Sequence, residues 1–458
     1  MPAAVRSELG QLRMLHKTFR PYDQHTLLLM PPSLTDWVAD DGLVAYLNDL
    51  VDELDLSPLL AAHDEPRGKP PYHPALMLKL LLYGYASGVR SSRKLEARCA
   101  ADVNFMFLTG QARPDHKTIS EFRRRHLAAF SALFVDVLAL CQRAGLVRLG
   151  RVALDGTKLK ANASKHKAMS YGRMAKREAE LEAEVKAILD EAEAIDAAED
   201  EQFGDARGDE LPPELARRES RLAKIREAKA ALEAEARERT GDPDAVPEPT
   251  AQRNFTDPES RIMRSKNDGF IAGYNAQLAV DEVHQIVVAC DLSADPTDTR
   301  ALPDLVDQIE RNTGHRPKRA LADAGYYSDA NLDHLEAAEI EPFIATRRMK
   351  HSDQLAPAPR GRIPKHLSRR ERMARKLATQ AGRRHYARRK VIVEPVFGQH
   401  KECRGFRRVS LRGEANARAE WILINLVHNL GKLFSSGRGN RVLAGRGRCG
   451  PVVSGMAA

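Results

Sequence analysis

The chain of 458 residues is poor in cysteine and in aromatic side chains, and it has no long apolar run. Its five cysteines are odd in number and never spaced as C-x-x-C, so neither a disulfide framework nor a cysteine zinc site is predicted, and a reducing, cytoplasmic compartment is favoured. No apolar run approaches the roughly 18 residues of a membrane-spanning helix. The first residues lack the layout of a secretory signal. We therefore expect no contact with a membrane.

Signatures of nucleotide cofactors are also missing. The sequence has no P-loop, and no G-x-G-x-x-G opens a helix after a strand, so ATP or NAD chemistry is not predicted. The histidines show no metal-ligand spacing.

Positive charge is abundant and concentrated in one segment. The net charge is +9, yet residues 345–412 alone hold 21 Lys and Arg against four Asp and Glu. A basic excess in one stretch is what a surface for a polyanion requires, whereas an ordinary soluble face mixes both signs. This segment therefore predicts contact with nucleic acid.

Four regions follow from the pattern along the chain. We expect a helical N-terminal domain over 1–145, an α/β domain over 146–172 and 250–434, a helical hairpin over 173–249, and a disordered tail over 435–458. Residues 173–240 carry 13 basic and 20 acidic side chains with apolar residues at heptad spacing, and GDARGDELPP interrupts them. The hairpin is either a structural arm or a dimerisation element.

The N-terminal region predicts several short helices. Pro74 suits a first helical turn, and Thr118 with Glu121 has capping-box spacing ahead of a helix that carries Arg123 and Arg124. Short helices whose last member is basic fit a helix-turn-helix-like module, in which Arg123 and Arg124 would contact DNA. A small helical bundle without DNA contacts has the same pattern.

The α/β region predicts the order strand, insertion, strand, strand, helix, strand, helix, strand, which is typical of a mixed sheet with helices on its faces. VRLGRVALDGTKLKA alternates like a strand pair. In it, Asp155 is a turn residue by propensity, or a ligand at a strand end.

Three acids stand at the expected ends of elements. Asp155 closes the first strand, Asp323 closes the fourth, and Glu394 precedes a proline suited to a first helical turn. Carboxylates from separate elements can meet at one edge of a sheet and bind Mg²⁺, a hard cation that prefers oxygen ligands. Arg389, Lys390 and Lys401 would offset the charge and hold a DNA backbone nearby.

These motifs resemble those of the DDE transposases of bacterial insertion sequences. The resemblance rests on DGT after an apolar strand, on ADAGYYS, and on a Glu followed by six residues and a Lys, and it covers roughly residues 20–435. One subgroup of that family has a third motif of Tyr, Arg, Glu and Lys, which Tyr386, Arg389, Glu394 and Lys401 match in order. Four residues separate Arg389 from Glu394 where the family usually has three, and Lys390 has the usual spacing.

The resemblance implies an RNase H-like core in which Asp155, Asp323 and Glu394 bind two Mg²⁺ ions, with Mn²⁺ as a possible substitute. It also implies cleavage by water at the element's ends, followed by attack of the freed 3′-hydroxyl on target DNA. Tyr386 and the neighbouring arginine would contact DNA near the cut.

The partners implied are double-stranded DNA and further copies of the chain, as a homodimer or higher oligomer on DNA, near the bacterial nucleoid. Lys401 lies about two helical turns beyond Glu394, which would place both on one helix face. Two alternatives stay open at this point. One is a metal-dependent nuclease of the same fold that does not join strands, and the other is a non-enzymatic, architectural DNA-binding protein.

Overall fold

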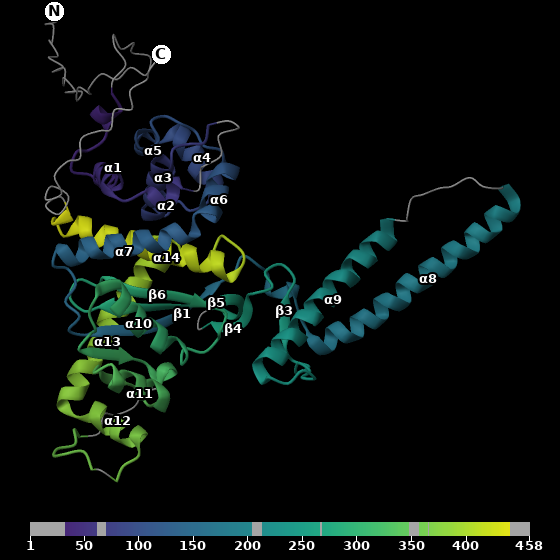
Figure 1. The fold of residues 1–458 in the computed structure, drawn as a ribbon. Helices are drawn as coiled ribbons and strands as arrows, with labels where there is room; N and C mark the ends of the chain where they lie inside the picture. The colour runs from purple at the N-terminus through teal and green to yellow at the C-terminus, as the bar shows by residue number, and fades with distance from the viewer. Residues whose placement is uncertain are drawn as a thin grey trace, which may run out of the picture.

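The computed structural model describes residues 33–61, 70–203, 213–265, 268–347, 357–364 and 366–439. The N-terminal part is helical (Figure 1), with elements η1 (Leu34–Trp37), α1 (Leu43–Glu53), α2 (Ser57–Leu60), α3 (Pro74–Ala86), α4 (Ser92–Ala101), α5 (Val103–Leu108), α6 (His116–Arg125) and α7 (Leu127–Arg143). Pro74 opens α3, as predicted. The cap of α6 is Asp115 rather than Thr118, because the Asp115 carboxylate accepts hydrogen bonds from the backbone N–H groups of Lys117 and Thr118 at 2.8 and 3.0 Å.

A mixed six-stranded sheet forms the centre of the molecule. Its strands are β1 (Val152–Lys160), β4 (Arg261–Ser265), β5 (Gly269–Asp281), β6 (Val287–Ser293), β7 (Arg319–Ala322) and β8 (Glu341–Ile344), in the order β4-β5-β1-β7-β8 with β6 also paired to β5. β1 is antiparallel to β5 and parallel to β7. Helices α10 (Ala301–Thr313) and α11 (Asp329–Ala337) and the short η3 (Ala324–Tyr326) connect the later strands. This chain order is the one predicted, except that the sheet has one more strand than expected, β4, which precedes β5 and pairs with it.

The Asp-Gly pair at Asp155 is not a hairpin turn. β1 runs straight through it, and all nine residues from Val152 to Lys160 pair with β5. The expected strand pair is therefore one strand, and Asp155 lies within it rather than at its end. The turn propensity of Asp-Gly is overridden here because the apolar residues of β1 are buried between two neighbouring strands.

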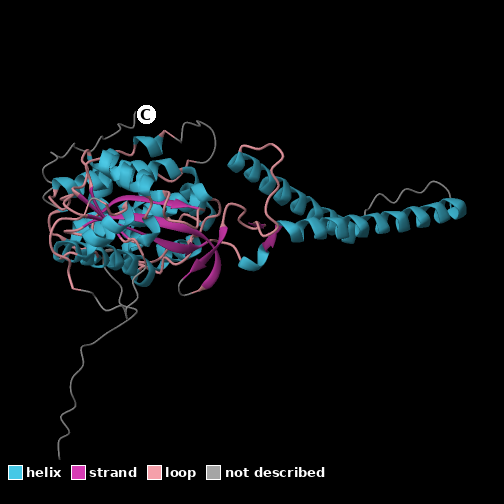
Figure 2. Ribbon diagram, turned by 90° about the horizontal axis from the view of Figure 1, so that it is seen from below, coloured by secondary structure: helices cyan, strands magenta, loops and turns pink. Residues whose placement is uncertain are grey.

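A long helical arm leaves the sheet after β1. Helices α8 (Tyr171–Phe203) and α9 (Pro213–Thr240) lie side by side and project from the rest of the molecule (Figures 1 and 2). The base of the arm is closed by η2 (Lys165–Lys167) and by the pairing of β2 (Ala168–Ser170) with β3 (Gln252–Asn254). Its own small core contains Met174, Leu181, Leu222, Ile225 and Leu232. The side chains from Ile188 to Ile195 of the expected heptad seam, and Leu215, lie outside the described side chains.

The C-terminal helices are α12 (Arg369–Ala378), α13 (Gln380–Gly398), the π-helical turn η4 (Gln399–Cys403) and α14 (Glu414–Ser435). In Figure 1, α7 and α14 lie between the sheet and the N-terminal helices. One continuous hydrophobic core extends from the N-terminal helices through α14 into the sheet. The expected disordered tail lies, from residue 440 on, outside the described residues.

Among the described residues, no single helix is long and apolar enough to cross a membrane, although α6 and α7 pass the test of length and composition when taken together as a pair bent by 72°.

Candidate active site

Asp155 and Asp323 lie at neighbouring positions on two adjacent parallel strands. Val152 of β1 pairs with Ala320 of β7, and the same register continued by three residues places Asp155 beside Asp323. β7 ends one residue before Asp323, whose Oδ1 accepts a hydrogen bond of 2.8 Å from the backbone N–H of Gly325. The carboxyl ends of parallel strands are where α/β sheets gather functional groups. Two of the three expected acids therefore meet.

The electrostatics of this pair are unusual for carboxylates. Burial, together with the nearby negative charge of Asp323, raises the pKa of Asp155 to about 6. The guanidinium of Arg389 lowers the same pKa, because its Nη1 donates to Asp155 Oδ2 at 2.7 Å. Both side chains of this ion pair are largely buried, with 10% of Arg389 and 17% of Asp155 exposed. Burial beside a second carboxylate thus disfavours the charged form of Asp155, and the Arg389 guanidinium offsets part of that cost.

Glu394 does not begin a helix. It lies inside α13, which starts much earlier with Thr379 as its cap, and Pro395 is an interior residue of that helix. A proline there leaves the carbonyl of Val391 without its helical donor, and Gln285 Nε2 supplies a hydrogen bond to that carbonyl at 3.0 Å instead. The expectation of a proline at the first helical turn is therefore wrong, because a side chain from another element makes the interior proline tolerable.

The structure does not bring Glu394 to the two aspartates. Its side chain is exposed, next to the buried Val393, and Arg389 of the same helix makes the contact with Asp155. Within the described ranges, no group of three or more His, Cys, Asp or Glu side chains is arranged to hold a metal ion.

Lys401 reaches β1 from the π-helical turn. Its Nζ donates to the hydroxyl of Thr157, which lies two residues beyond Asp155 and hence on the same face of the strand. Burial lowers the pKa of the Lys401 ammonium. π-Helical turns occur preferentially at functional sites, and here the turn brings a cation to the aspartate face of β1. No signal in the sequence singled out Thr157 as the partner of Lys401.

Tyr386 and Lys390 occupy different sides of α13. The Arg389 guanidinium lies 5.9 Å from the centre of the half-buried Tyr386 ring. Burial raises the pKa of the Tyr386 hydroxyl. Lys390 is exposed. Of the two neighbouring cations, Arg389 is therefore the one that contacts Asp155.

Arg123 and Arg124 also point in different directions. Arg123 is only 4% exposed, and its Nη1 donates to the Tyr85 hydroxyl at 3.2 Å and to the Arg90 carbonyl at 3.0 Å. The expectation that Arg123 contacts DNA is wrong, because α6 turns this side chain into the protein. Arg124 is exposed and forms an ion pair with Glu121.

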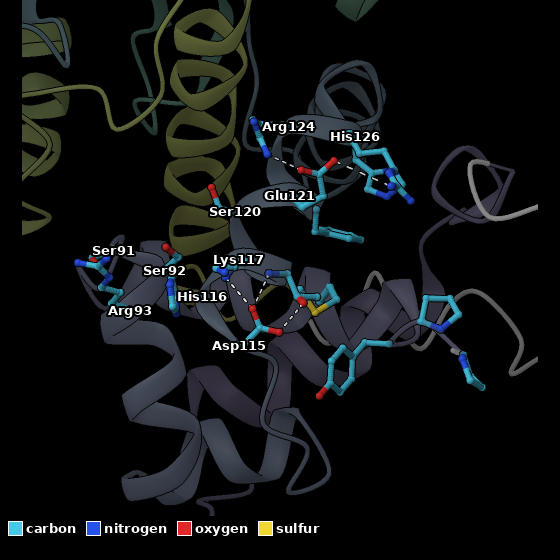
Figure 3. Close-up of a pocket in the computed structure, with 17 residues that line it drawn as sticks. Ser91, Ser92, Arg93, Asp115, His116, Lys117, Ser120, Glu121, Arg124 and His126 are labelled. Carbon is cyan, nitrogen blue, oxygen red and sulfur yellow. Dashed lines mark hydrogen bonds and ion pairs between the residues drawn. The ribbon is translucent and has the colours of Figure 1, made fainter. Parts of the chain in front are cut away.

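Arg124 borders a cleft of about 1190 Å³ in the N-terminal helices (Figure 3). The start of α4 and most of α6 line this cleft. Arg93 and Lys117, which the sequence did not single out, are exposed side chains of its wall and add positive charge there.

The aspartate pair fits a divalent cation. Two adjacent carboxylates, one of them with a raised pKa, supply the oxygen ligands that Mg²⁺ prefers, and Mg²⁺ commonly completes its shell with water and phosphate oxygens. Two carboxylates are thus enough for the protein's share of such a site.

Two family models match the chain. One is described as Transposase DDE domain and matches residues 244–430, and the other is described as Transposase domain (DUF772) and matches residues 32–125. The first match includes Asp323 and Glu394, whereas Asp155 and most of the arm lie between the two matches. A search of curated proteins and a search of solved structures each give no match.

The two matches together span more than half of the chain. A DDE domain implies an RNase H-like fold, and the mixed sheet with flanking helices agrees with it. Transposases bind DNA, and the DDE family generally uses a divalent metal. The chain therefore belongs to the DDE transposases of insertion sequences.

Proposed function

We propose that this transposase binds the ends of its insertion sequence, cleaves the DNA there and joins the freed 3′-hydroxyl to target DNA. The family matches support the transposase assignment. The observation that carries the chemistry is the register of β1 and β7, which sets Asp155 beside Asp323.

Asp155 and Asp323 are the proposed ligands of Mg²⁺, for which Mn²⁺ can substitute. When two such ions are bound, they activate a water or a hydroxyl and stabilise the leaving oxygen of an in-line displacement. Glu394 is the proposed third ligand. Its support is the order and spacing of the motif, since no contact joins it to the two aspartates.

Cations of the C-terminal region have proposed roles in holding DNA. Arg389 and Lys401 lie on the aspartate face of β1 and would bind phosphates beside the reacting bond. Tyr386 packs against Arg389 and would contact DNA near the cut. Lys390 is exposed and would contact the backbone farther away. Phosphate contacts of this kind position DNA without reading its sequence.

The helical residues 1–145 are the proposed unit for recognising element ends, with Arg124 on the wall of the cleft in Figure 3. Residues 146–172 and 250–434 are the proposed catalytic domain, with residues 173–249 as its inserted arm. We further propose that the protein acts at the nucleoid in the bacterial cytoplasm, as a dimer or higher oligomer on DNA.

The test is cleavage of DNA that carries the flanking element ends, in Mg²⁺ and in Mn²⁺, by the wild type and by Asp155→Asn, Asp323→Asn and Glu394→Gln. We expect each variant to bind the DNA with near wild-type affinity and to lose cleavage. DNA binding without cleavage by the wild type would favour the architectural alternative. Cleavage without joining of a 3′-hydroxyl to target DNA would favour a nuclease. A variant that still cleaves like the wild type would remove its residue from the metal site.

A further inference from the structure

A fourth acid, Asp298, accepts several hydrogen bonds on the face of β1 opposite to the aspartate pair. It lies in the connection between β6 and α10, and its Oδ1 accepts hydrogen bonds from Asn275 Nδ2 at 2.7 Å and from Gln277 Nε2 at 2.8 Å. Lys158 Nζ lies 3.4 Å from the same oxygen. Asn275 and Gln277 are essentially fully buried in β5. One carboxylate oxygen thus satisfies two buried amides, and losing it would leave them without that acceptor.

The same carboxylate approaches the glycines that follow both proposed ligands. A Cβ atom on Gly156 would stand 2.8 Å from Asp298 Oδ1, and one on Gly325 would stand 3.0 Å from Asp298 Oδ2. Real Cβ atoms essentially never come closer than 3.0 Å to another heavy atom. Asp298 therefore directs one oxygen toward the residue after Asp155 and the other toward the turn after Asp323. A side chain at Gly156 would clash with the first oxygen, and one at Gly325 would push the second aside by a few tenths of an ångström.

Asp298 lies on the face of β1 opposite to Asp155. Side chains alternate between the two faces of a strand, so Gly156 and Lys158 present the face opposite to that of Asp155. Asp298 contacts the former face, whereas Arg389 and Lys401 approach the latter. This placement suits a support for the backbone rather than a ligand that shares a metal with Asp155.

The connection also fastens the turn that carries Asp323. Thr299 Oγ1 donates to the carbonyl of Gly325 at 2.8 Å. The hydroxyl of the fully buried Tyr326 donates to Gln277 Oε1, whose amide nitrogen donates to Asp298. Gln277 therefore links Asp298 to the turn through its side chain.

We propose that Asp298 is a positioning residue that sets the spacing of Asp155 and Asp323 for metal binding. Its two oxygens and its hydrogen bonds hold β1, β5 and the turn after β7 in one arrangement. This inference rests on the proposed function of the two aspartates. Outer residues that orient metal ligands typically change metal affinity by about 10- to 100-fold when removed.

The experiment is a titration of the whole protein with Mn²⁺, followed by electron paramagnetic resonance, together with DNA cleavage. We expect Asp298→Ala to weaken the binding of the Mn²⁺ ion that depends on Asp155 by at least about tenfold. Asp298→Asn keeps an oxygen that can accept hydrogen bonds from both amides. Its affinity for Mn²⁺ should therefore stay within about threefold of the wild type, a smaller loss than the one expected for Asp298→Ala. Asp295→Ala, in the same connection, is the control and should have no effect, since the hydrogen bonds and the ion pair of the Asp295 side chain within the described part of the chain go to Thr297 and Arg300.

Wild-type affinity in Asp298→Ala would overturn the proposal. Equal loss in Asp298→Asn and Asp298→Ala would also overturn it, because the charge rather than the hydrogen bonds would then matter. If the wild type binds Mn²⁺ through Asp155 and does not cleave DNA, the proposed function fails and the positioning role stands. If the wild type binds no Mn²⁺, both fail.

A second variant covers the case in which Asp298→Ala does not fold. Gly325→Ala adds a methyl group toward both Asp298 and Asp323 at a backbone that is not in the left-handed region. It should weaken Mn²⁺ binding by about tenfold, as expected for a displaced ligand support. Where Asp298→Ala folds, Gly325→Ala should have a smaller effect on Mn²⁺ binding in that variant than in the wild type. The effects of substitutions at residues in contact are not additive. No loss in Gly325→Ala alone would overturn the proposal.

Discussion

Arg389 and Lys390 are adjacent residues of like charge with opposite surroundings. The Arg389 guanidinium is paired with the largely buried Asp155 at 2.7 Å, whereas Lys390 is exposed. Removing one member of a buried pair leaves an uncompensated charge, so Arg389→Ala should lower the free energy of unfolding by about 3 kcal/mol. Lys390→Ala should change it by less than about 0.5 kcal/mol. Urea unfolding of both variants at pH 7.5 tests this, and equal effects would contradict the buried pair.

Two buried histidines in edge-to-face contact give the protein a dependence on pH. Burial, together with the nearby guanidinium of Arg404, lowers the pKa of His400 to about 3. Burial and the neighbouring His400 lower the pKa of His428. The rings lie 5.4 Å apart beside Trp421, and His400 is hydrogen-bonded to Asn425. Both rings are therefore held neutral in the folded state.

The sign of the pH effect follows from these lowered values. Above about pH 6.5 a histidine is neutral in the folded and unfolded states alike. Below that pH the unfolded chain takes up protons that the folded state does not, so the free energy of unfolding falls by up to about 1.4 kcal/mol per pH unit for each histidine. Between pH 7.5 and 5.5, His400→Gln should lose about 1 kcal/mol less than the wild type. Equal losses in denaturant unfolding would show that His400 does not cause the dependence.

At the scale of elements, the order of strands and helices could be predicted from the sequence, and several boundaries could not. Apolar runs and their periods predicted the strands β1, β5, β6 and β7 and the helices between them. The exact role of Asp-Gly at Asp155 and of Pro395 depended on contacts from distant segments. β5 holds β1 straight through Asp155, and Gln285 satisfies the carbonyl that Pro395 leaves open. Local propensity is overridden wherever such a partner exists.

The arm has a hydrophobic core of its own, separate from the core of the sheet. Its apolar residues form their own cluster, and Arg218 of α9 contacts Glu184 of α8 at 3.0 Å. Replacing residues 186–217 by a short Gly-Ser turn should therefore join two nearby ends and change the free energy of unfolding of the rest by less than about 0.5 kcal/mol. Calorimetry tests this expectation, and a large loss would mean that the arm supports the sheet. Light scattering of the DNA-bound protein, with and without the distal arm, separates a structural arm from a dimerisation element.

At the scale of the whole molecule, the candidate site was predictable in part. Asp155 and Asp323 could be paired because each follows a short apolar run, whereas the parallel register that sets them side by side came only from the structure. The inward turn of Arg123, the contact of Lys401 with Thr157 and the support by Asp298 could not be predicted. Each depends on how helices and loops far apart in the chain pack on one another, and no local pattern encodes that packing.

Glu420 is the clearest case of such packing, because it joins the N-terminal helices to the C-terminal segment. Its side chain is completely buried in α14. The Tyr85 hydroxyl of α3 donates to it at 2.8 Å, and the backbone N–H of Ser410 donates at 2.6 Å. Arg90 lies 3.9 Å from the same carboxylate and donates to the carbonyl of Gly405. One buried acid thus connects three segments that are distant in sequence.

Removing this acid should affect both parts of the protein together. Glu420→Ala leaves the Tyr85 hydroxyl and the Ser410 N–H without their acceptor and Arg90 without its nearby anion, so the free energy of unfolding should fall by about 3 kcal/mol or more. Glu420→Gln keeps an acceptor oxygen and should cost less. Glu402→Ala, whose exposed carboxylate pairs with Arg407, is the control and should cost less than about 0.5 kcal/mol. Denaturant unfolding decides among them. If Glu420→Ala were as mild as Glu402→Ala, the N-terminal helices would be held to the sheet by apolar packing alone.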